Sequence, residues 1–175
     1  LTFAPNNIQL LKIKSDIFRQ TNQREQSLAV GQQIITLEPD NWLGYSRVID
    51  DFLELDRLDD AKSSLNTYLD QHPNELNPLK AAVKLFTKAN DIQTALDYAN
   101  SIIDLFPSDS IGYVLKANRL KIIERFTDAQ EVLQQGLTFA PNNIQLLKIK
   151  SDIFRQTNQR EQSLAVGQQI ITLEP

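Results

Sequence analysis

A lone histidine is the first residue in this sequence whose side chain could do acid–base or metal chemistry. His72 is the only histidine among 175 residues, and the chain has no cysteine. A nucleophilic triad or a histidine metal site would have to use His72 without a second histidine or a thiolate beside it. His72 also directly precedes Pro73, where a connection between helices is expected. We interpret it as a solvated turn residue.

A run of acidic side chains is the second candidate for chemistry. Paired carboxylates can transfer protons or bind a metal ion, but this run has neither the glycine nor the ligand spacing of a calcium loop. A solvated helix end and turn explains it better. The five glycines are scattered, so the chain has no phosphate-binding loop either. The sequence therefore predicts a protein that is not an enzyme and uses no cofactor or metal. The acidic residues are Asp50, Asp51, Glu54, Asp56, Asp59 and Asp60.

Composition limits the class of partner. The sequence is 41% hydrophobic and 23% charged, which is typical of a soluble folded protein. Its net charge of −4 argues against nucleic acid, which selects clustered positive charge. No apolar run is long enough for a membrane span, and no signal-peptide pattern is present. The absence of cysteine leaves the compartment open between the cytoplasm and a bacterial periplasm. Because the chain also lacks methionine, we expect it to be part of a longer protein.

Prolines divide the chain into segments of equal length. Six of the seven prolines recur at one constant interval along the sequence. Proline lacks the amide that a helix interior needs, so each should lie between one helix pair and the next. The residues that follow them (PNN, PDN, PNE, PSD and PNN) supply Asn, Asp and Ser side chains for helix N-caps. The six are Pro5, Pro39, Pro73, Pro107, Pro141 and Pro175.

This register predicts a single array of helical hairpins over residues 1–175. Each hairpin should contain two helices of about 13 residues joined by a tight turn. Short polar side chains tolerate the left-handed backbone of such a turn, and they occur at Asn22, Asp56, Asn90 and Asn158. Glu124 at the same place in the fourth hairpin is a weaker signal. The predicted hairpins are 8–41, 42–75, 76–109, 110–143 and 144–175, preceded by 1–7 as the tail of another hairpin.

The chain also contains an exact repeat, in addition to the divergent repeat of the hairpins. Residues 137–175 duplicate residues 1–39 without a single difference. The two copies are offset by four of the proline intervals, so the repeated block spans 1–136. The duplication is a recent natural copy, an engineered copy, or one block counted twice in an averaged repeating structure. Each of these implies that a block of four hairpins can follow itself head to tail.

The period and the pattern within each hairpin resemble the tetratricopeptide repeat (TPR) family, which has a 34-residue unit. Position 11 of the unit reads Phe18, Phe52, Phe86, Leu120 and Phe154, and position 32 is always proline. Position 20 is small each time, as close helix crossing requires: Ser27, Ala61, Ala95, Ala129 and Ser163. The resemblance implies an all-α, right-handed superhelical solenoid of antiparallel helix pairs. Positions 8 and 27 depart from the family by carrying larger residues, namely Ile49, Val83, Ile34, Tyr68 and Ile102.

The resemblance also implies a binding groove along the first helix of each hairpin. Lys80, Lys84 and Lys88 are spaced four residues apart and therefore share one face of one helix. Such a groove would hold a peptide or protein segment, acidic and with aliphatic anchors. The alternative is that the lysines are a solvated face and the aliphatic residues are core. The residues that map to the groove are Asp50, Asn77, Lys80, Lys84, Lys88, Ile111, Val114, Asn118, Lys121 and Ile122.

One use known for the family is not expected here. The clamp that grips the C-terminal carboxylate of chaperones needs Lys, Asn, Asn, Lys and Arg at fixed positions in three successive hairpins. Starting from the first hairpin, those positions read Lys12, Asp16, Arg47, Asn77 and Ala81. The other two starting points fit no better, so we predict no chaperone-tail binding.

Two hypotheses about function remain after this reading. The first is a non-catalytic interaction scaffold that binds a peptide or protein segment in the concave groove. The second is a structural spacer, or an array of 136-residue blocks that stack head to tail with other copies. A final hairpin without a polar closing helix would leave apolar surface for such homotypic stacking.

Overall fold

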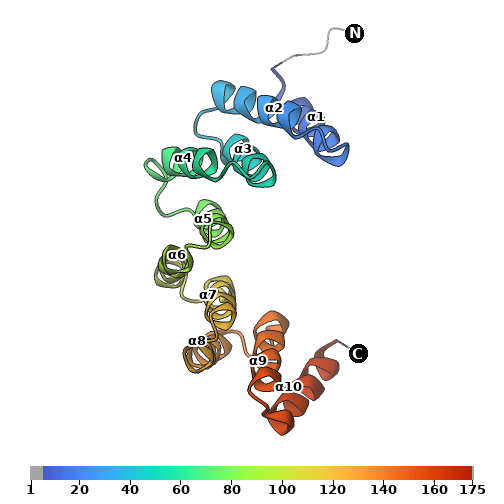
Figure 1. The fold of residues 1–175 in the computed structure, drawn as a ribbon, viewed down its shortest axis with the longest axis vertical. Coiled ribbons are helices and arrows are strands. Elements are labelled where there is room, and N and C mark those ends of the chain that lie inside the picture. The colour runs from blue at the N-terminus through green and yellow to red at the C-terminus, as the bar shows by residue number, and fades with distance from the viewer. Residues whose placement is uncertain (1–5, 175) are drawn as a thin grey trace. The chain divides into compact units, whose positions relative to one another are not determined.

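The computed structural model describes residues 6–174, which fold into ten α-helices and contain no β-strand. The all-α class predicted from the sequence is confirmed, while the right-handed superhelix stays a prediction. None of these helices has the length and apolar character required to span a membrane. Figure 1 shows the order α1 (Ile8–Gln20), α2 (Arg24–Leu37), α3 (Trp42–Glu54), α4 (Leu58–Leu69), α5 (Leu76–Lys88), α6 (Ile92–Leu105), α7 (Ser110–Ile122), α8 (Phe126–Phe139), α9 (Ile144–Gln156) and α10 (Arg160–Leu173).

The helices begin at regular intervals along the chain. The first helices of the pairs start at Ile8, Trp42, Leu76, Ser110 and Ile144, which repeat at the same interval as the prolines. The four internal prolines of the register lie in the connections between pairs, as predicted. Pro5 and Pro175 lie outside the described residues.

Polar side chains cap four of the five first helices, as the residues after each proline predict. The N-cap side chains of Asn7, Asn41, Asp109 and Asn143 each accept a hydrogen bond from a backbone N–H of the first turn. Glu75, at the same place before α5, makes no such bond. The Asn cap predicted from PNE is therefore wrong, because the cap position is occupied by Glu75, whose carboxylate is hydrogen-bonded elsewhere.

The turn inside each pair has a left-handed residue at the predicted place. Asn22, Asp56, Asn90, Glu124 and Asn158 have φ angles between 57° and 59°. Asparagine and aspartate tolerate this conformation because their short side chains bond locally, whereas glutamate has no such advantage. Four of the turns thus have a residue that favours the left-handed conformation. The fifth turn forms although Glu124 does not favour it.

Replacing Glu124 by glycine should stabilise the protein by about 0.5–1 kcal/mol, since glycine enters the left-handed region without a steric penalty. Thermal denaturation of the variant beside the parent chain would measure this. Asn90→Gly is the matched control and should shift the midpoint less, because asparagine already suits its turn. A midpoint for Glu124→Gly at or below the parent's would contradict the prediction.

Glycines allow successive helix pairs to approach closely. A Cβ on Gly44 would lie 2.9 Å from the backbone nitrogen of Ile35, and one on Gly112 would lie 3.0 Å from that of Ile103. The larger residues that depart from the family pattern are accommodated in the core. Ile34 is fully buried three residues after Gly31, whose absent Cβ leaves room for Val48.

The chain forms two compact units, one up to Asn90 and one from Asp91 onward. In the first, α2 packs against α3, and α5 packs against both α3 and α4. In the second, α7 packs against α6 and α8, and α9 packs against α7, α8 and α10 (Figure 1). A hydrophobic core of the second unit includes Tyr113, Leu133, Leu146 and Ile153.

Candidate binding surface

The α3–α5 surface brings three of the predicted groove residues together. Lys84 Nζ lies 2.7 Å from Asp50 Oδ1, and Lys88 Nζ donates to the main-chain carbonyl of Leu53 at the end of α3. Asp50 also lies 3.6 Å from Arg19 Nη2. A cation at the C-terminus of α3 is favoured by the helix dipole. The lysines of α5 thus extend from α5 onto the neighbouring first helix.

This surface can exchange its ion pair for one with a partner. The side chains of Lys84 and Asp50 are 61% and 40% exposed. An ion pair that is so exposed contributes only about 0–1 kcal/mol, because water screens it. A partner's carboxylate could therefore replace Asp50 at little cost. Lys80 is partly exposed and forms no ion pair within residues 6–174, while Asn77 is exposed.

The predicted groove residues on α7 divide between surface and core. Ile122 is 57% exposed, and Ile111 and Asn118 are half-buried. Val114 is only 7% exposed and belongs to the hydrophobic core, so it offers a partner almost no surface. Lys121 Nζ lies 3.3 Å from Asp152 Oδ2 on the adjacent α9.

Asp152 was missed by the sequence reasoning, although the register contained a signal for it. Lys121 and Asp152 occupy the same positions in successive hairpins as Arg19 and Asp50, which also pair. A basic residue at position 12 followed by an acidic residue at position 9 of the next hairpin would have predicted both contacts.

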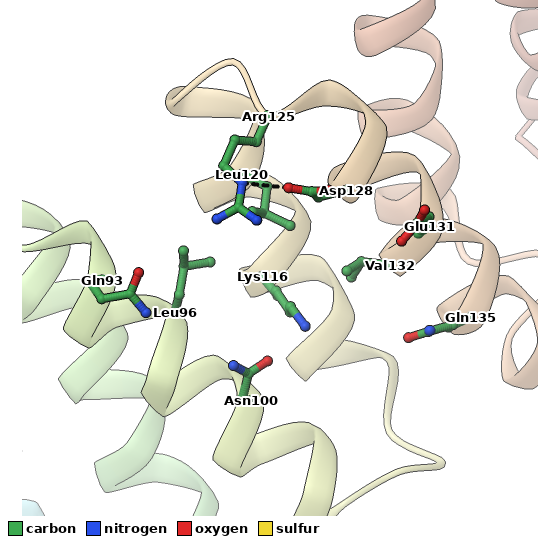
Figure 2. A pocket seen from close by; sticks show the side chains of 10 residues that line it. All are labelled: Gln93, Leu96, Asn100, Lys116, Leu120, Arg125, Asp128, Glu131, Val132 and Gln135. Atoms are coloured by element: carbon green, nitrogen blue, oxygen red, sulfur yellow. Dashed lines mark hydrogen bonds and ion pairs between the residues drawn. The ribbon is translucent and has the colours of Figure 1, made fainter.

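A cleft of about 320 Å³ lies among α6, α7 and α8 and was also missed (Figure 2). Apolar side chains of Leu96, Leu120 and Val132 contribute to its wall. The Arg125 Nε donates to Asp128 Oδ2 at its edge, as the dashed line in Figure 2 marks. Sequence reasoning followed only the first helices, whereas most of this lining comes from second helices. The polar lining residues are Gln93, Asn100, Lys116, Arg125, Asp128, Glu131 and Gln135.

His72 is not the solvated residue that we expected. It lies between α4 and α5, but its ring stacks on Tyr68 with centroids 4.4 Å apart and its side chain is 25% exposed. His72 Nδ1 lies 3.1 Å from Glu75 Oε1, and the Tyr68 hydroxyl donates to Glu75 Oε2 at 3.0 Å. These contacts hold the Glu75 carboxylate and explain why it does not cap α5. Burial, followed by the bond to Glu75, raises the pKa of Tyr68 to about 12.

The raised pKa of Tyr68 predicts a loss of stability in strong alkali. The folded state holds the phenolic proton more tightly than the unfolded chain, whose tyrosines have a pKa of about 10. This contribution is complete below about pH 10 and is lost as the pH rises towards 12. Urea denaturation from neutral pH to pH 12 should therefore show a steeper alkaline fall for the parent than for Tyr68→Phe. Parallel pH profiles would refute this.

The acidic run divides between the surface and the core. Within residues 6–174 no three His, Cys, Asp or Glu side chains are grouped to hold a metal ion. Asp60 pairs with Arg57 at 2.7 Å on the surface. Asp51, however, is fully buried, with Oδ1 2.8 Å from Arg19 Nε and 3.3 Å from Arg24 Nη1. The interpretation of the whole run as solvated is therefore wrong for Asp51, which links α3 to the first helix pair.

Comparison with known proteins identifies the fold. No protein-family model matches the chain, and no curated protein matches its sequence. A tetratricopeptide repeat protein from Parabacteroides merdae ATCC 43184 superimposes with a TM-score of 0.75 at 15% identity, over 97% of this chain and 66% of that one. The chain has the tetratricopeptide repeat fold. Its TPR fold confirms the resemblance that the proline register indicated.

Other TPR-like structures superimpose over similar lengths. MamA from Desulfovibrio magneticus RS-1 (residues 41 to the end) gives a TM-score of 0.72 at 14% identity, over 95% of this chain and 94% of that one. YrrB, described as a TPR protein with an unusual peptide-binding site, gives 0.63 at 14% identity over 92% and 83%. The likeness at these identities is one of fold, and the neighbours are similar in architecture to this chain.

Proposed function

We propose that this protein is a non-catalytic scaffold that binds a segment of another protein along its first helices. The observation that carries the proposal is the exposed Asp50–Lys84 pair beside Lys88, a cationic surface whose internal partner is easily exchanged. The TPR fold supports it, because such arrays present long surfaces for partners. YrrB, with the same fold, is described as having a peptide-binding site.

The chemistry of these surfaces favours an acidic partner with aliphatic anchors. Carboxylates spaced along a peptide would meet Lys80, Lys84 and Lys88 on one face of α5. In the second unit, α7 presents a separate surface, where the exposed Ile122 and the half-buried Ile111 would contact aliphatic side chains. The proposal excludes nucleic acid as the partner, since the net charge is −4.

Replacing the three lysines of α5 by glutamine tests the proposal. The probe is a fluorescent peptide of alternating Glu and Leu, followed by anisotropy at low and physiological salt. Three weak charge contacts add to about 1.4 kcal/mol, so the variant should bind about tenfold less tightly at low salt. Glutamine is preferable to glutamate, because a glutamate at position 84 would be repelled by Asp50.

A charge-matched variant provides the control for this experiment. Lys14, Lys62 and Lys150 lie outside the predicted groove positions, and replacing them by glutamine removes the same net charge. This control should retain the parent's affinity. Its lysines lie over the rings of Phe18, Phe86 and Phe154, so it should lose slightly more thermal stability than the α5 variant. Equal losses of affinity in the two variants would show that only net charge matters, and no loss in either would refute a site on α5.

Homotypic stacking is a second candidate function, and the exposure of α10 favours it. Leu164 and Ile171 are 75% and 61% exposed. Large apolar side chains at such exposure on one helix are unusual for a surface without a partner. A stacking surface on α10 would join copies of the 136-residue block.

A further inference from the structure

The pairs α1–α2 and α9–α10 have the same sequence but different neighbours, so each shows what the other could bind. We call forward face the side of each pair that points towards the next pair along the chain. In the first copy, α3 covers this face. A Cβ on Gly31 would lie 2.8 Å from Val48 Cγ2, and Arg24 binds the buried Asp51. Leu28 on the same face is 5% exposed.

The forward face of α9–α10 is open. Leu164, the twin of Leu28, is 75% exposed, and a Cβ on Gly167, the twin of Gly31, would have nothing within 4 Å. Arg155, the twin of Arg19, is 73% exposed instead of 20%. The residues within the two pairs are identical, so the difference in exposure comes from the cover that α3 provides for α1–α2.

The opposite side, or back face, shows the reverse exposure. Ile13 and Ile17 of α1 are each 54% exposed, whereas their twins Ile149 and Ile153 of α9 are 5% and 0% exposed. The twins on α9 pack into the core formed with α7 and α8. The structure thus contains the natural cover of each face of this sequence, and the cover of the forward face is α3 of the pair α3–α4.

Simple end-to-end contact does not reproduce either of these covers. If the forward face of α9–α10 met the back face of α1–α2 in another copy, two surfaces would touch that nowhere meet in this chain. Complementary packing requires the forward face to meet the α3 surface that bears Val48 and Asp51. In another copy of the chain, that surface is occupied by its own α1–α2.

We propose that the forward face of α9–α10 binds the pair α3–α4 of a second copy of this chain, taking the place of that copy's α1–α2. Gly167 would then lie against Val48, and Arg155 and Arg160 would bind Asp51. The proposal rests on the second candidate function and names its surface and its partner. Such a contact joins different surfaces of the two copies, so it can extend into a chain of molecules.

The chain's own α1–α2 competes with α9–α10 of another molecule for the surface of α3. The pair α1–α2 is tethered to α3 by residues 38–41 alone, which gives it an effective concentration of about millimolar or more. A second copy at micromolar concentration cannot displace it, so the parent chain should be monomeric there and should associate only as its concentration approaches the millimolar range. Weakening α1–α2 without changing α9–α10 should start the assembly.

Substitutions at the twin glycines test this in the full chain. Gly31→Val places atoms where Val48 Cγ2 already lies 2.8 Å from an added Cβ, so it should release α1–α2. Light scattering on a sizing column should then show mass that increases with concentration. The double variant Gly31→Val, Gly167→Val carries the same obstruction on the forward face of α9–α10, so it should be a monomer again. Gly167→Val alone should be monomeric with the parent's thermal stability, because that position is open.

Each other result would overturn the inference. If the double variant associates as strongly as Gly31→Val, copies stack through another surface, and only the homotypic function survives. If Gly31→Val stays monomeric while hydrogen exchange shows α1–α2 released, the forward face does not bind α3–α4.

An extended chain keeps the test decisive if Gly31→Val fails to fold. A second copy of residues 40–75 is placed after Pro175, which reproduces the junction that follows Pro39. Amides of α10 should then gain the hydrogen-exchange protection of α2, and Gly167→Val should abolish the gain. An extension with residues 74–109 should give less protection. Equal protection from both extensions, or none from either, would refute the match between the forward face and α3–α4.

Discussion

Replacing Leu28 by alanine should lower the free energy of unfolding by about 3 kcal/mol, whereas the same change at Leu164 should leave it nearly unchanged. The two leucines lie in identical local sequences, yet they are 5% and 75% exposed. Alanine at position 28 leaves a cavity between α2 and its neighbours and loses the transfer free energy of the buried methyl groups. At position 164 the removed atoms are already in water. Urea denaturation followed by circular dichroism would measure both variants.

The back face supplies the reciprocal pair of variants. Ile153 is fully buried and Ile17 is 54% exposed, so Ile153→Ala should cost about 3–4 kcal/mol and Ile17→Ala less than about 1 kcal/mol. Because helical arrays can unfold in parts, hydrogen exchange in α2 and α9 should accompany the denaturation curves. Equal losses within a twin pair would mean that the local sequence, and not the neighbouring helices, determines the cost.

Local backbone chemistry explains why so much of the fold could be predicted. Proline is excluded from helix interiors, so the internal prolines of the register lie between helix pairs, while Pro78 is tolerated in the first turn of α5. Asparagine or aspartate favours a left-handed turn residue at Asn22, Asp56, Asn90 and Asn158. These effects act within a few residues, so they can be inferred from a sequence alone. The positions of the helices and turns follow from them. Glu124 adopts the same turn against its preference, because the packing of α7 against α8 determines the conformation there.

Contacts between helix pairs could not be predicted in this way. The twin hairpins demonstrate the limit, since Leu28 and Leu164 have the same local sequence and opposite exposure. Glu75 has the position of a helix cap, but Tyr68 and His72 from the preceding pair bind its carboxylate. The burial of Asp51 depends on arginines that belong to the preceding helix pair. Side-chain pairing at these sites depends on which surfaces meet, which the proline register does not encode.

Asp51 should be the most sensitive acidic residue of the chain. It is fully buried, and its Oδ1 binds both Arg19 and Arg24. Removing one side of a buried ion pair leaves uncompensated charge and typically costs about 3–5 kcal/mol. Asp51→Ala should therefore lower the free energy of unfolding by that amount. Asp50→Ala, one residue earlier but 40% exposed, should cost less than about 1 kcal/mol. Comparable losses in the two variants would contradict this.

An apolar replacement of the whole cluster separates the cost of lost charge from the cost of lost packing. Asp51 Oδ2 is buried and accepts no hydrogen bond within residues 6–174, so the carboxylate is incompletely satisfied. Leu85 occupies the equivalent position of α5 and is fully buried, which shows that the fold accepts leucine there. The triple variant Arg19→Met, Arg24→Met, Asp51→Leu should accordingly regain most of the stability that Asp51→Ala loses. If it stays as unstable as Asp51→Ala, the ion pairs themselves stabilise the contact between α1–α2 and α3. In that case Arg155 and Arg160 would strengthen the proposed exchange by the same pairing.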